Sequence, residues 1–379
     1  MRESLRLFIL AGEPSGDRIA ADLVGRLRQK VDVTLSGVGG DELIGQGLVP
    51  LFPMSDLAVM GVTDVIVNLP KLLWRIGQAT RAILRSKPDM VVLVDAQDFS
   101  RLLAARLRAK GFSGPIILYV APSVWARHPE RAAKLRPLFD ATLAVLPFEP
   151  AVMQRLGGPP TRYVGHPALG EALLTQTAPK QGPLVLLPGS RKGELRRHLP
   201  LLAAIAPSLL AEAAVTELVI PTLPALRGRL EKAVANWPVP VRIEDRRAER
   251  KALYGQAVAA ICVSGTVTLE LALARVPMLV IYALDGPQAR VYEQIGRPQV
   301  SLPNIILGRQ AVPELVSQSL SAEAVGGAAF ALVRDLGARQ AQVAAFAELY
   351  TLMQVGEADY GRQDPADEVL AVLRGHVRR

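Results

Sequence analysis

Cysteine and histidine are scarce in this sequence. It has one cysteine, Cys262, and four histidines, which lie far apart. A single cysteine excludes an internal disulfide and a zinc site built on several cysteines, and it suits a reducing compartment such as the cytoplasm. The histidines have no spacing typical of metal ligands. We therefore expect neither a metal site nor a cofactor.

Long apolar runs and aromatic residues are also lacking. No stretch is apolar for long enough to span a bilayer, and residues 7–11 lead straight into a glycine-containing turn, so we expect neither a membrane span nor a signal peptide. Aromatic residues make up 5% of the chain and no recognition motif is present, which argues against a nucleic-acid partner. The net charge of +9 still calls for an anionic partner, either a membrane surface or a phosphorylated substrate.

The chain of 379 residues is long enough for two domains of ordinary size. Short apolar strands alternate with helical periods in both halves, and the composition changes near Pro167. This pattern predicts an α/β protein with two Rossmann-like, doubly wound domains that face a cleft. We place the first domain at 1–167 and the second at 168–345. Beyond Gly308 we expect mostly helices, capped at Ser321 and Asp364, and those at 346–379 would pack back on the first domain or on a partner chain.

Two carboxylates follow the most apolar strand of the first half. Residues 91–94 have the composition of a strand buried on both faces, and Asp95 and Asp98 come directly after it. Open α/β sheets bind ligands beyond the carboxyl ends of their strands, so these two residues are our candidate catalytic acids. Asp98 has a second interpretation, as the cap of a helix that begins near Phe99.

Polar and glycine residues follow other strands of the first half. The strand at 5–11 leads into a turn whose glycines would admit a ligand close to the backbone, at the start of a helix. The spacing is not the dinucleotide pattern GxGxxG, and a tight turn without a ligand explains it as well. His166 fits acid–base chemistry, a phosphate contact or a structural role. The candidate acceptor-binding residues of this half are Gly12, Ser15, Gly16, Asp17, Ser123 and His166.

In the second half, a short turn with glycine and hydroxyl residues joins a buried strand to a helix at two places. Residues 189–191 and 264–266 each follow a buried strand and open a helix, and the N-terminus of a helix favours a diphosphate. Arg191 adds a bidentate positive charge, and Glu270 would accept hydrogen bonds from a ribose. Together with the turn at Asn304 they predict a nucleotide-sugar site, and helix capping by Ser264 or Thr266 is the alternative. The candidate UDP-binding residues are Gly189, Ser190, Arg191, Ser264, Gly265, Thr266, Glu270 and Asn304.

Residues 69–85 predict an amphipathic helix with an apolar face and a basic flank that includes Lys71, Arg75, Arg81 and Arg85. Such a helix fits an anionic membrane surface, and it equally fits a helix that covers the sheet. The segment before it, rich in methionine and leucine, favours the membrane.

Together, these motifs resemble the lipid-A-disaccharide synthase family, glycosyltransferase family 19. The resemblance runs in family order over nearly the whole chain, through residues 12–17, 57–61, 94–99, 122–126, 146–149, 164–167, 187–191, 264–270, 301–304 and 312–315. The chain departs from the family pattern at Gln97, at Ser100, at Arg127-His128 and over 285–298.

This resemblance implies a GT-B fold and an inverting, metal-independent glycosyl transfer. The donor would be UDP-2,3-diacylglucosamine, the acceptor 2,3-diacylglucosamine 1-phosphate (lipid X), and the products lipid A disaccharide 1-phosphate and UDP. We expect Asp95 to be the base, with Asp98 positioning it or taking its place. Acyl chains on both substrates imply a cytoplasmic enzyme bound peripherally to the anionic inner-membrane surface.

Several readings stay open at this point. One is another GT-B enzyme of UDP-sugars, either a transferase or a UDP-N-acetylglucosamine epimerase. Another is a non-catalytic nucleotide-binding protein of the membrane surface. The sequence also leaves open whether the chain forms a homodimer.

Overall fold

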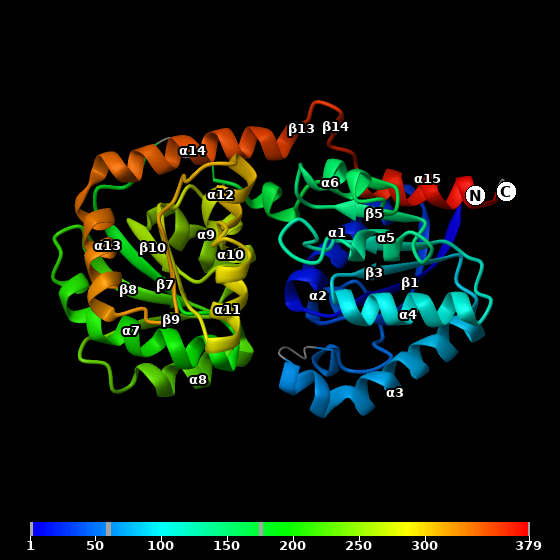
Figure 1. Cartoon of the computed structure of the whole chain (residues 1–379), viewed down its shortest axis with the longest axis horizontal. Helices are drawn as coiled ribbons and strands as arrows, with labels where there is room; N and C mark the ends of the chain where they lie inside the picture. Colours follow the sequence, from blue (N-terminus) through cyan, green and yellow to red (C-terminus); the bar gives the residue numbers. More distant parts are fainter. Residues whose placement is uncertain (1–2, 58–61, 174–176, 378–379) are drawn as a thin grey trace. The chain divides into compact units, whose positions relative to one another are not determined.

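The computed structural model describes residues 3–57, 62–173 and 177–377 (Figure 1). The chain divides into two compact units, of which the first comprises Met1–Pro167 with Met353–Arg379 and the second Ala168–Leu352. In the described part of the chain, no helix combines the length and the apolar character that crossing a membrane requires.

The first unit is built on a six-stranded parallel sheet with the order β2-β1-β3-β4-β5-β6. Its strands are β1 (Ser4–Ala11), β2 (Asp32–Val38), β3 (Met90–Val94), β4 (Ile116–Tyr119), β5 (Ala141–Ala144) and β6 (Thr161–Tyr163). The strand order reverses between β1 and β3, and in doubly wound sheets such a reversal marks the ligand-binding edge. The predicted strand at 91–94 is therefore confirmed and lies in the middle of the sheet.

Helices cover both faces of this sheet. The helices of this unit are α1 (Pro14–Lys30), α2 (Asp41–Gly45), α3 (Val62–Ser86), α4 (Gln97–Ala109), α5 (Arg131–Leu135), α6 (Glu149–Arg155) and α15 (Pro365–Val377), with the short turn η1 (Met54–Asp56). The short turn η2 (Pro167–Glu171) lies at the boundary with the second unit. Side chains of a strand alternate between the faces, and Leu10 and Leu93 join a core cluster with α3 and α4. Helix α1 packs against β1, β2 and β3 and is absent from that cluster, so it covers the other face.

The C-terminal segment folds back on the first unit within the same chain. Helix α15 packs on α1, where Arg26 pairs with Asp364 at 3.1 Å and Lys30 pairs with Asp367 at 2.6 Å. Tyr163 at the end of β6 donates a hydrogen bond to the carbonyl of Met353. The hairpin of β13 (Gly356–Glu357) and β14 (Tyr360–Gly361) precedes α15.

The second unit repeats the design with a parallel sheet of order β12-β11-β10-β7-β8-β9. Its strands are β7 (Gly182–Leu187), β8 (Val215–Pro221), β9 (Arg242–Glu244), β10 (Ala259–Cys262), β11 (Met278–Ala283) and β12 (Glu314–Ser317). Its helices are α7 (Lys192–Leu210), α8 (Pro224–Val234), α9 (Arg247–Gln256), α10 (Thr266–Leu273), α11 (Gly286–Gln294), α12 (Leu302–Leu307), α13 (Ala322–Arg334) and α14 (Leu336–Val355). The boundary between the two units falls inside α14.

Beyond Gly308 the chain is mostly helical, as expected, but it also contains short strands that were not expected. The predicted caps are confirmed, because Ser321 accepts a hydrogen bond from the N–H of Ala324 and Asp364 accepts one from that of Ala366. The strand β12 was missed, however. All four of its residues are only half-buried, since it lies at the edge of the sheet, and an edge strand lacks the apolar run that identifies a central one.

Candidate functional site

Asp95 follows β3 directly and lies half-buried at the carboxyl end of the first sheet. Its backbone φ is 56° and that of Ala96 is 47°, so two successive residues without a glycine adopt the left-handed region. The hydroxyl of Ser100 donates to the Asp95 carbonyl at 2.8 Å and helps to hold this conformation. Non-glycine residues with a left-handed backbone each lower the stability of the fold by about 1–3 kcal/mol, and they occur preferentially at functional sites. The backbone therefore supports the carboxyl end of β3 as a functional site.

The glycine turn after β1 packs directly against this loop. A Cβ atom added at Gly12 would lie 2.4 Å from the Cβ of Ala96, and one added at Gly16 would lie 3.2 Å from the Cβ of Asp95. The structure thus brings Gly12, Gly16 and Asp95 together. The two glycines allow the turn before α1 and the first turn of α1 to pack closely against the loop after β3.

Asp98 is exposed in the first turn of α4. The interpretation of Asp98 as a helix cap is wrong, because α4 begins at Gln97 and its N-cap residue is Ala96. A carboxylate in the first turn is still stabilised by the helix dipole. Asp98 therefore presents a charged group to solvent close to Asp95.

The remaining predicted residues of the first unit differ in exposure. Ser15 is half-buried in the first turn of α1, Ser123 is exposed after β4, and His166 is buried after β6. Asp17 is 2% exposed, and its carboxylate accepts hydrogen bonds from the N–H groups of Gly40 at 2.8 Å and Glu42 at 2.9 Å. Burial raises the pKa of Asp17 against the opposing effect of these donors. Asp17 therefore fastens the start of α2, which is a structural role that its spacing in the sequence did not indicate.

The turn after β7 holds the first predicted diphosphate contact. Glu194, which is 5% exposed in the first turn of α7, accepts hydrogen bonds from the N–H groups of Ser190 at 3.1 Å and Arg191 at 3.3 Å. The Arg191 guanidinium contacts the same carboxylate at 3.0 Å. Gly189 has a φ of 101°, and a Cβ there would lie 2.4 Å from the Glu194 carboxylate. These N–H groups were expected to face a diphosphate, and in the structure both donate to Glu194.

The turn after β10 holds the second predicted contact. The N-cap residue of α10 is Gly265, with a φ of 140°, and no side chain caps this helix. The hydroxyl of Ser264 instead donates to the carbonyl of Val300 at 2.6 Å. The capping alternative for Ser264 and Thr266 is therefore wrong. Glu270 lies half-buried one turn further along α10.

Asn304 is fully buried in α12. Its amide donates to the carbonyl of Val312 at 2.9 Å and to Glu314 at 2.7 Å, and its oxygen accepts from the N–H groups of Ala311 at 2.7 Å and Val312 at 2.9 Å. These four bonds use the full hydrogen-bonding capacity of an asparagine side chain. We correct the expectation of a direct nucleotide contact at Asn304, since the side chain is spent on holding the turn.

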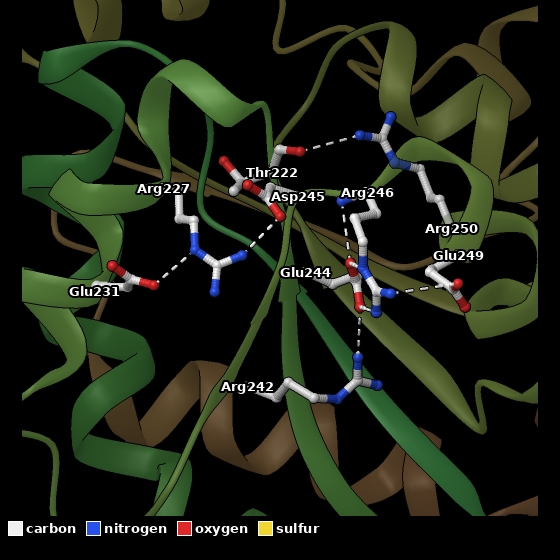
Figure 2. A network of polar contacts seen from close by, with 9 residues as sticks. All are labelled: Thr222, Arg227, Glu231, Arg242, Glu244, Asp245, Arg246, Glu249 and Arg250. Atoms are coloured by element: carbon white, nitrogen blue, oxygen red, sulfur yellow. Dashed lines mark hydrogen bonds and ion pairs between the residues drawn. The ribbon is translucent and has the colours of Figure 1, made fainter.

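Figure 2 shows a polar network at the carboxyl ends of β8 and β9 that was not predicted from the sequence. Glu244, the last residue of β9, accepts hydrogen bonds from Arg246 at 3.1 Å and Arg242 at 3.1 Å, and Arg246 holds its pKa below the usual value. Arg250 donates to the carbonyl of Thr222 at 3.1 Å. The only feature of the sequence that could have predicted this network is the mixture of acidic and basic residues at 242–250. Glu244 is buried, but the Arg242 and Arg246 side chains are 43% and 68% exposed, and ion pairs with so exposed a partner add little stability. The network therefore mainly orders the loops at this edge of the sheet.

Glu149 is the last residue of the motif at 146–149, but it was not predicted to be a site residue. It begins α6 at the carboxyl end of β5, is 3% exposed, and accepts hydrogen bonds from the N–H groups of Val145 at 3.2 Å and Leu146 at 3.0 Å. Burial raises the pKa of Glu149 to about 8, against the opposing effect of these donors and of the indole of Trp125. The protonated form is therefore the one that folding favours.

This raised pKa predicts a pH-dependent stability. Between the ordinary value of 4.5 and about 8 the folded protein holds a proton at Glu149 that the unfolded chain has released. The contribution of Glu149 to stability is therefore complete below the lower value and falls as the pH rises, by at most about 1.4 kcal/mol per pH unit. Glu149→Gln removes this dependence, so its Tm relative to that of the wild type should be higher at pH 8 than at pH 5.

Thermal unfolding of both proteins at several pH values checks this prediction. Glu212→Gln is the control, because Arg334 lowers the pKa of Glu212 below its ordinary value of 4.5 and its Tm difference from the wild type should stay constant between pH 5 and pH 8. A constant Tm difference between Glu149→Gln and the wild type from pH 5 to pH 8 would contradict the prediction.

Comparison with known proteins places the chain in a family. A family model described as lipid-A-disaccharide synthetase matches residues 7–363. The lipid-A-disaccharide synthase of Rhodopseudomonas palustris (strain HaA2) is 38% identical over 383 residues, covering 98% of this chain and 97% of that protein. The chain belongs to the lipid-A-disaccharide synthase family.

The chain is also similar in fold to solved structures of other proteins. A UDP-N-acetylglucosamine 2-epimerase from Rickettsia bellii aligns with a TM-score of 0.58 at 15% identity, covering 100% of this chain and 98% of that one. MurG of Acinetobacter baumannii aligns with a TM-score of 0.53 at 13% identity, covering 98% and 99%. At these identities the likeness shows the fold alone, two parallel six-stranded α/β units of GT-B-like type.

Membership of the synthase family decides among the interpretations that the sequence left open. The chain is an enzyme, a glycosyltransferase of lipid A biosynthesis. The epimerase and the non-catalytic nucleotide-binding protein are thereby set aside. Of the motifs that carried the resemblance, the one at 57–61 lies outside the described residues except for Leu57.

Proposed function

We propose that the enzyme joins UDP-2,3-diacylglucosamine to 2,3-diacylglucosamine 1-phosphate (lipid X), with inversion and without a metal ion, to give lipid A disaccharide 1-phosphate and UDP. The observation that carries this proposal is the family match over residues 7–363. The half-buried carboxylate of Asp95 at the carboxyl end of β3 and the basic turn at Arg191 after β7 supply the two kinds of group that this chemistry needs.

In this mechanism Asp95 takes the proton of the acceptor hydroxyl while its oxygen attacks C1 of the donor sugar. The C1–O bond to UDP breaks on the opposite face of the sugar, which inverts the configuration. A positioned base contributes about 10²–10⁴-fold to such a step. Asp98 either positions Asp95 or acts as the base in its place. The charge that develops on the departing UDP is met by Arg191 and by the N-terminal turns of α7 and α10.

The experiment that tests this function is incubation of the purified protein with both lipid substrates, with UDP and disaccharide measured together. Equal amounts of the two products are expected, and neither when lipid X is omitted. Release of UDP without disaccharide would overturn the transferase proposal. A parallel reaction in EDTA is expected to keep its rate, and a loss that magnesium restores would overturn the metal-free mechanism.

We also propose that the enzyme works at the cytoplasmic face of the inner membrane, where its acylated substrates reside. Among the side chains of α3 that the structure describes, from Leu69 onward, three large apolar ones are exposed: Leu69 at 43%, Leu73 at 47% and Trp74 at 56%. The guanidinium of Arg75 stacks on the ring of Trp74 at 4.3 Å. Lys71 and Arg75 both pair with Asp56, so part of the positive charge of this helix is neutralised within the protein. The surface of α3 therefore offers apolar insertion at least as much as electrostatic attraction.

Vesicle binding tests this surface. Fully burying one large apolar side chain contributes roughly 1.5–3 kcal/mol, so Leu73→Ser with Trp74→Ser should lower partitioning into phosphatidylglycerol vesicles at least about tenfold. Leu223→Ser, at an exposed leucine of the second unit, is the matched control and should bind like the wild type. Sedimentation with vesicles at low and high salt measures both effects. Unchanged binding of the double variant would contradict the role of α3, and equal binding to phosphatidylcholine vesicles would contradict an electrostatic part.

A further inference from the structure

The carboxylate of Glu194 accepts three hydrogen bonds beside the proposed diphosphate contact at Arg191. One of its oxygens accepts from the N–H groups of Ser190 and Arg191, and the other contacts the Arg191 guanidinium. The side chain of Glu194 is 6% exposed, whereas that of Arg191 is 50% exposed. A buried acid therefore holds both the backbone and the guanidinium of a residue whose own side chain reaches solvent.

The backbone of Glu194 is fixed as well. Its carbonyl lies 2.8 Å from Nδ1 of the fully buried His198, and Nε2 of the same ring accepts the N–H of Ala283 at 2.9 Å. Because Nε2 accepts, the proton of the neutral ring is on Nδ1 and is donated to the Glu194 carbonyl. Burial lowers the pKa of His198 and favours this neutral form. The first turn of α7 is thereby tied to the end of β11.

We propose that Glu194 is a positioning residue of the nucleotide site, and that it fixes the Arg191 guanidinium in the orientation that receives the diphosphate of the donor. This inference rests on the proposed function, in which Arg191 meets the diphosphate. It also changes which groups of the turn are assigned to the diphosphate. The N–H groups of Ser190 and Arg191 serve Glu194, and the guanidinium supplies the charge.

Glu194→Gln separates this role from its alternatives. The amide oxygen of glutamine still accepts from the two N–H groups and keeps the turn, but its NH₂ group faces the guanidinium and releases it. If Glu194 were only a negative charge beside the diphosphate, removal of that charge would strengthen UDP binding. If Glu194 positions Arg191, the same substitution should weaken UDP binding.

The test is calorimetric titration of the full-length protein with UDP, together with steady-state kinetics. Glu194→Gln is expected to weaken UDP binding at least about tenfold, the size typical of a lost hydrogen bond to a charged group, and to raise the KM of the donor more than it lowers kcat. Added to Arg191→Ala, it should weaken binding no further, because both changes remove one interaction. Glu212→Gln, which breaks the Glu212–Arg334 pair elsewhere in the second unit, is the control and should leave UDP binding unchanged.

Equal or tighter UDP binding by Glu194→Gln overturns the inference, and so does an undiminished effect of Glu194→Gln in the Arg191→Ala background. An unchanged Tm of the variant shows that the turn is intact, and Glu194→Asp, whose shorter carboxylate can still pair with arginine, should recover part of the affinity. A wild type that binds UDP and forms disaccharide while Glu194→Gln behaves normally refutes the inference alone. A wild type that binds no UDP refutes the proposed function.

Discussion

Asparagine in place of Asp95 is expected to lower kcat by about 10²–10⁴-fold, the usual contribution of a positioned general base. The amide keeps the size of the side chain and tolerates the left-handed backbone at φ 56°, so the fold should survive the change. UDP binding should also survive, because Asp95 belongs to the first unit and the residues proposed to bind UDP belong to the second. Single-turnover rates with both lipid substrates, together with UDP titration and Tm, measure these effects.

Asp98→Asn is the matched comparison, since it makes the same chemical change three residues away in the first turn of α4. If Asp98 positions Asp95, its variant loses less activity than Asp95→Asn. The reverse order would assign the base to Asp98. Near-normal turnover in both variants would remove the catalytic role from this loop altogether.

Alanine in place of Arg191 is expected to lower kcat/KM by about 10²–10³-fold, the usual effect of removing one donor that stabilises charge in a transition state. It should also weaken UDP binding, because the guanidinium is the charged part of the proposed diphosphate contact. The protein should remain folded, since the side chain of Arg191 is half exposed. Calorimetry with UDP and initial rates at varied donor concentration check both parts.

Arg309→Ala provides the control for this loss of charge. Arg309 is 49% exposed, close to the 50% of Arg191, and it pairs with Glu348. A general effect of net charge on an anionic substrate would appear in both variants. Undiminished turnover and UDP affinity in Arg191→Ala would refute the proposed leaving-group site.

The sheets were predictable because their strands are strongly apolar. Central strands such as β3 are buried on both faces, so their residues form uninterrupted apolar runs, and the ends of those runs mark the carboxyl edge of the sheet. The candidate loops could be located in this way from the sequence alone. The short edge strand β12 has no such run and was missed.

The tasks of individual polar side chains were harder to predict. Asp17 binds backbone N–H groups of residues more than twenty positions away, and Asn304 binds those of a turn that follows its own helix. Glu194 resembles an ordinary residue in the first turn of a helix until the structure shows it between two N–H groups and a guanidinium. Which partner a polar group finds depends on tertiary packing, and spacing along the chain does not determine it.

The return of the C-terminal residues to the first unit has a consequence for biosynthesis. Residues 353–379 complete a body whose other part is Met1–Pro167, and the whole of the second unit is translated between them. Every residue of the second unit is therefore synthesised before α15, so the first unit is the last to be completed. A chain truncated after residue 352 would keep every residue of the second unit but would lack α15, and the surface of α1 that α15 covers is where a chaperone or a protease would act.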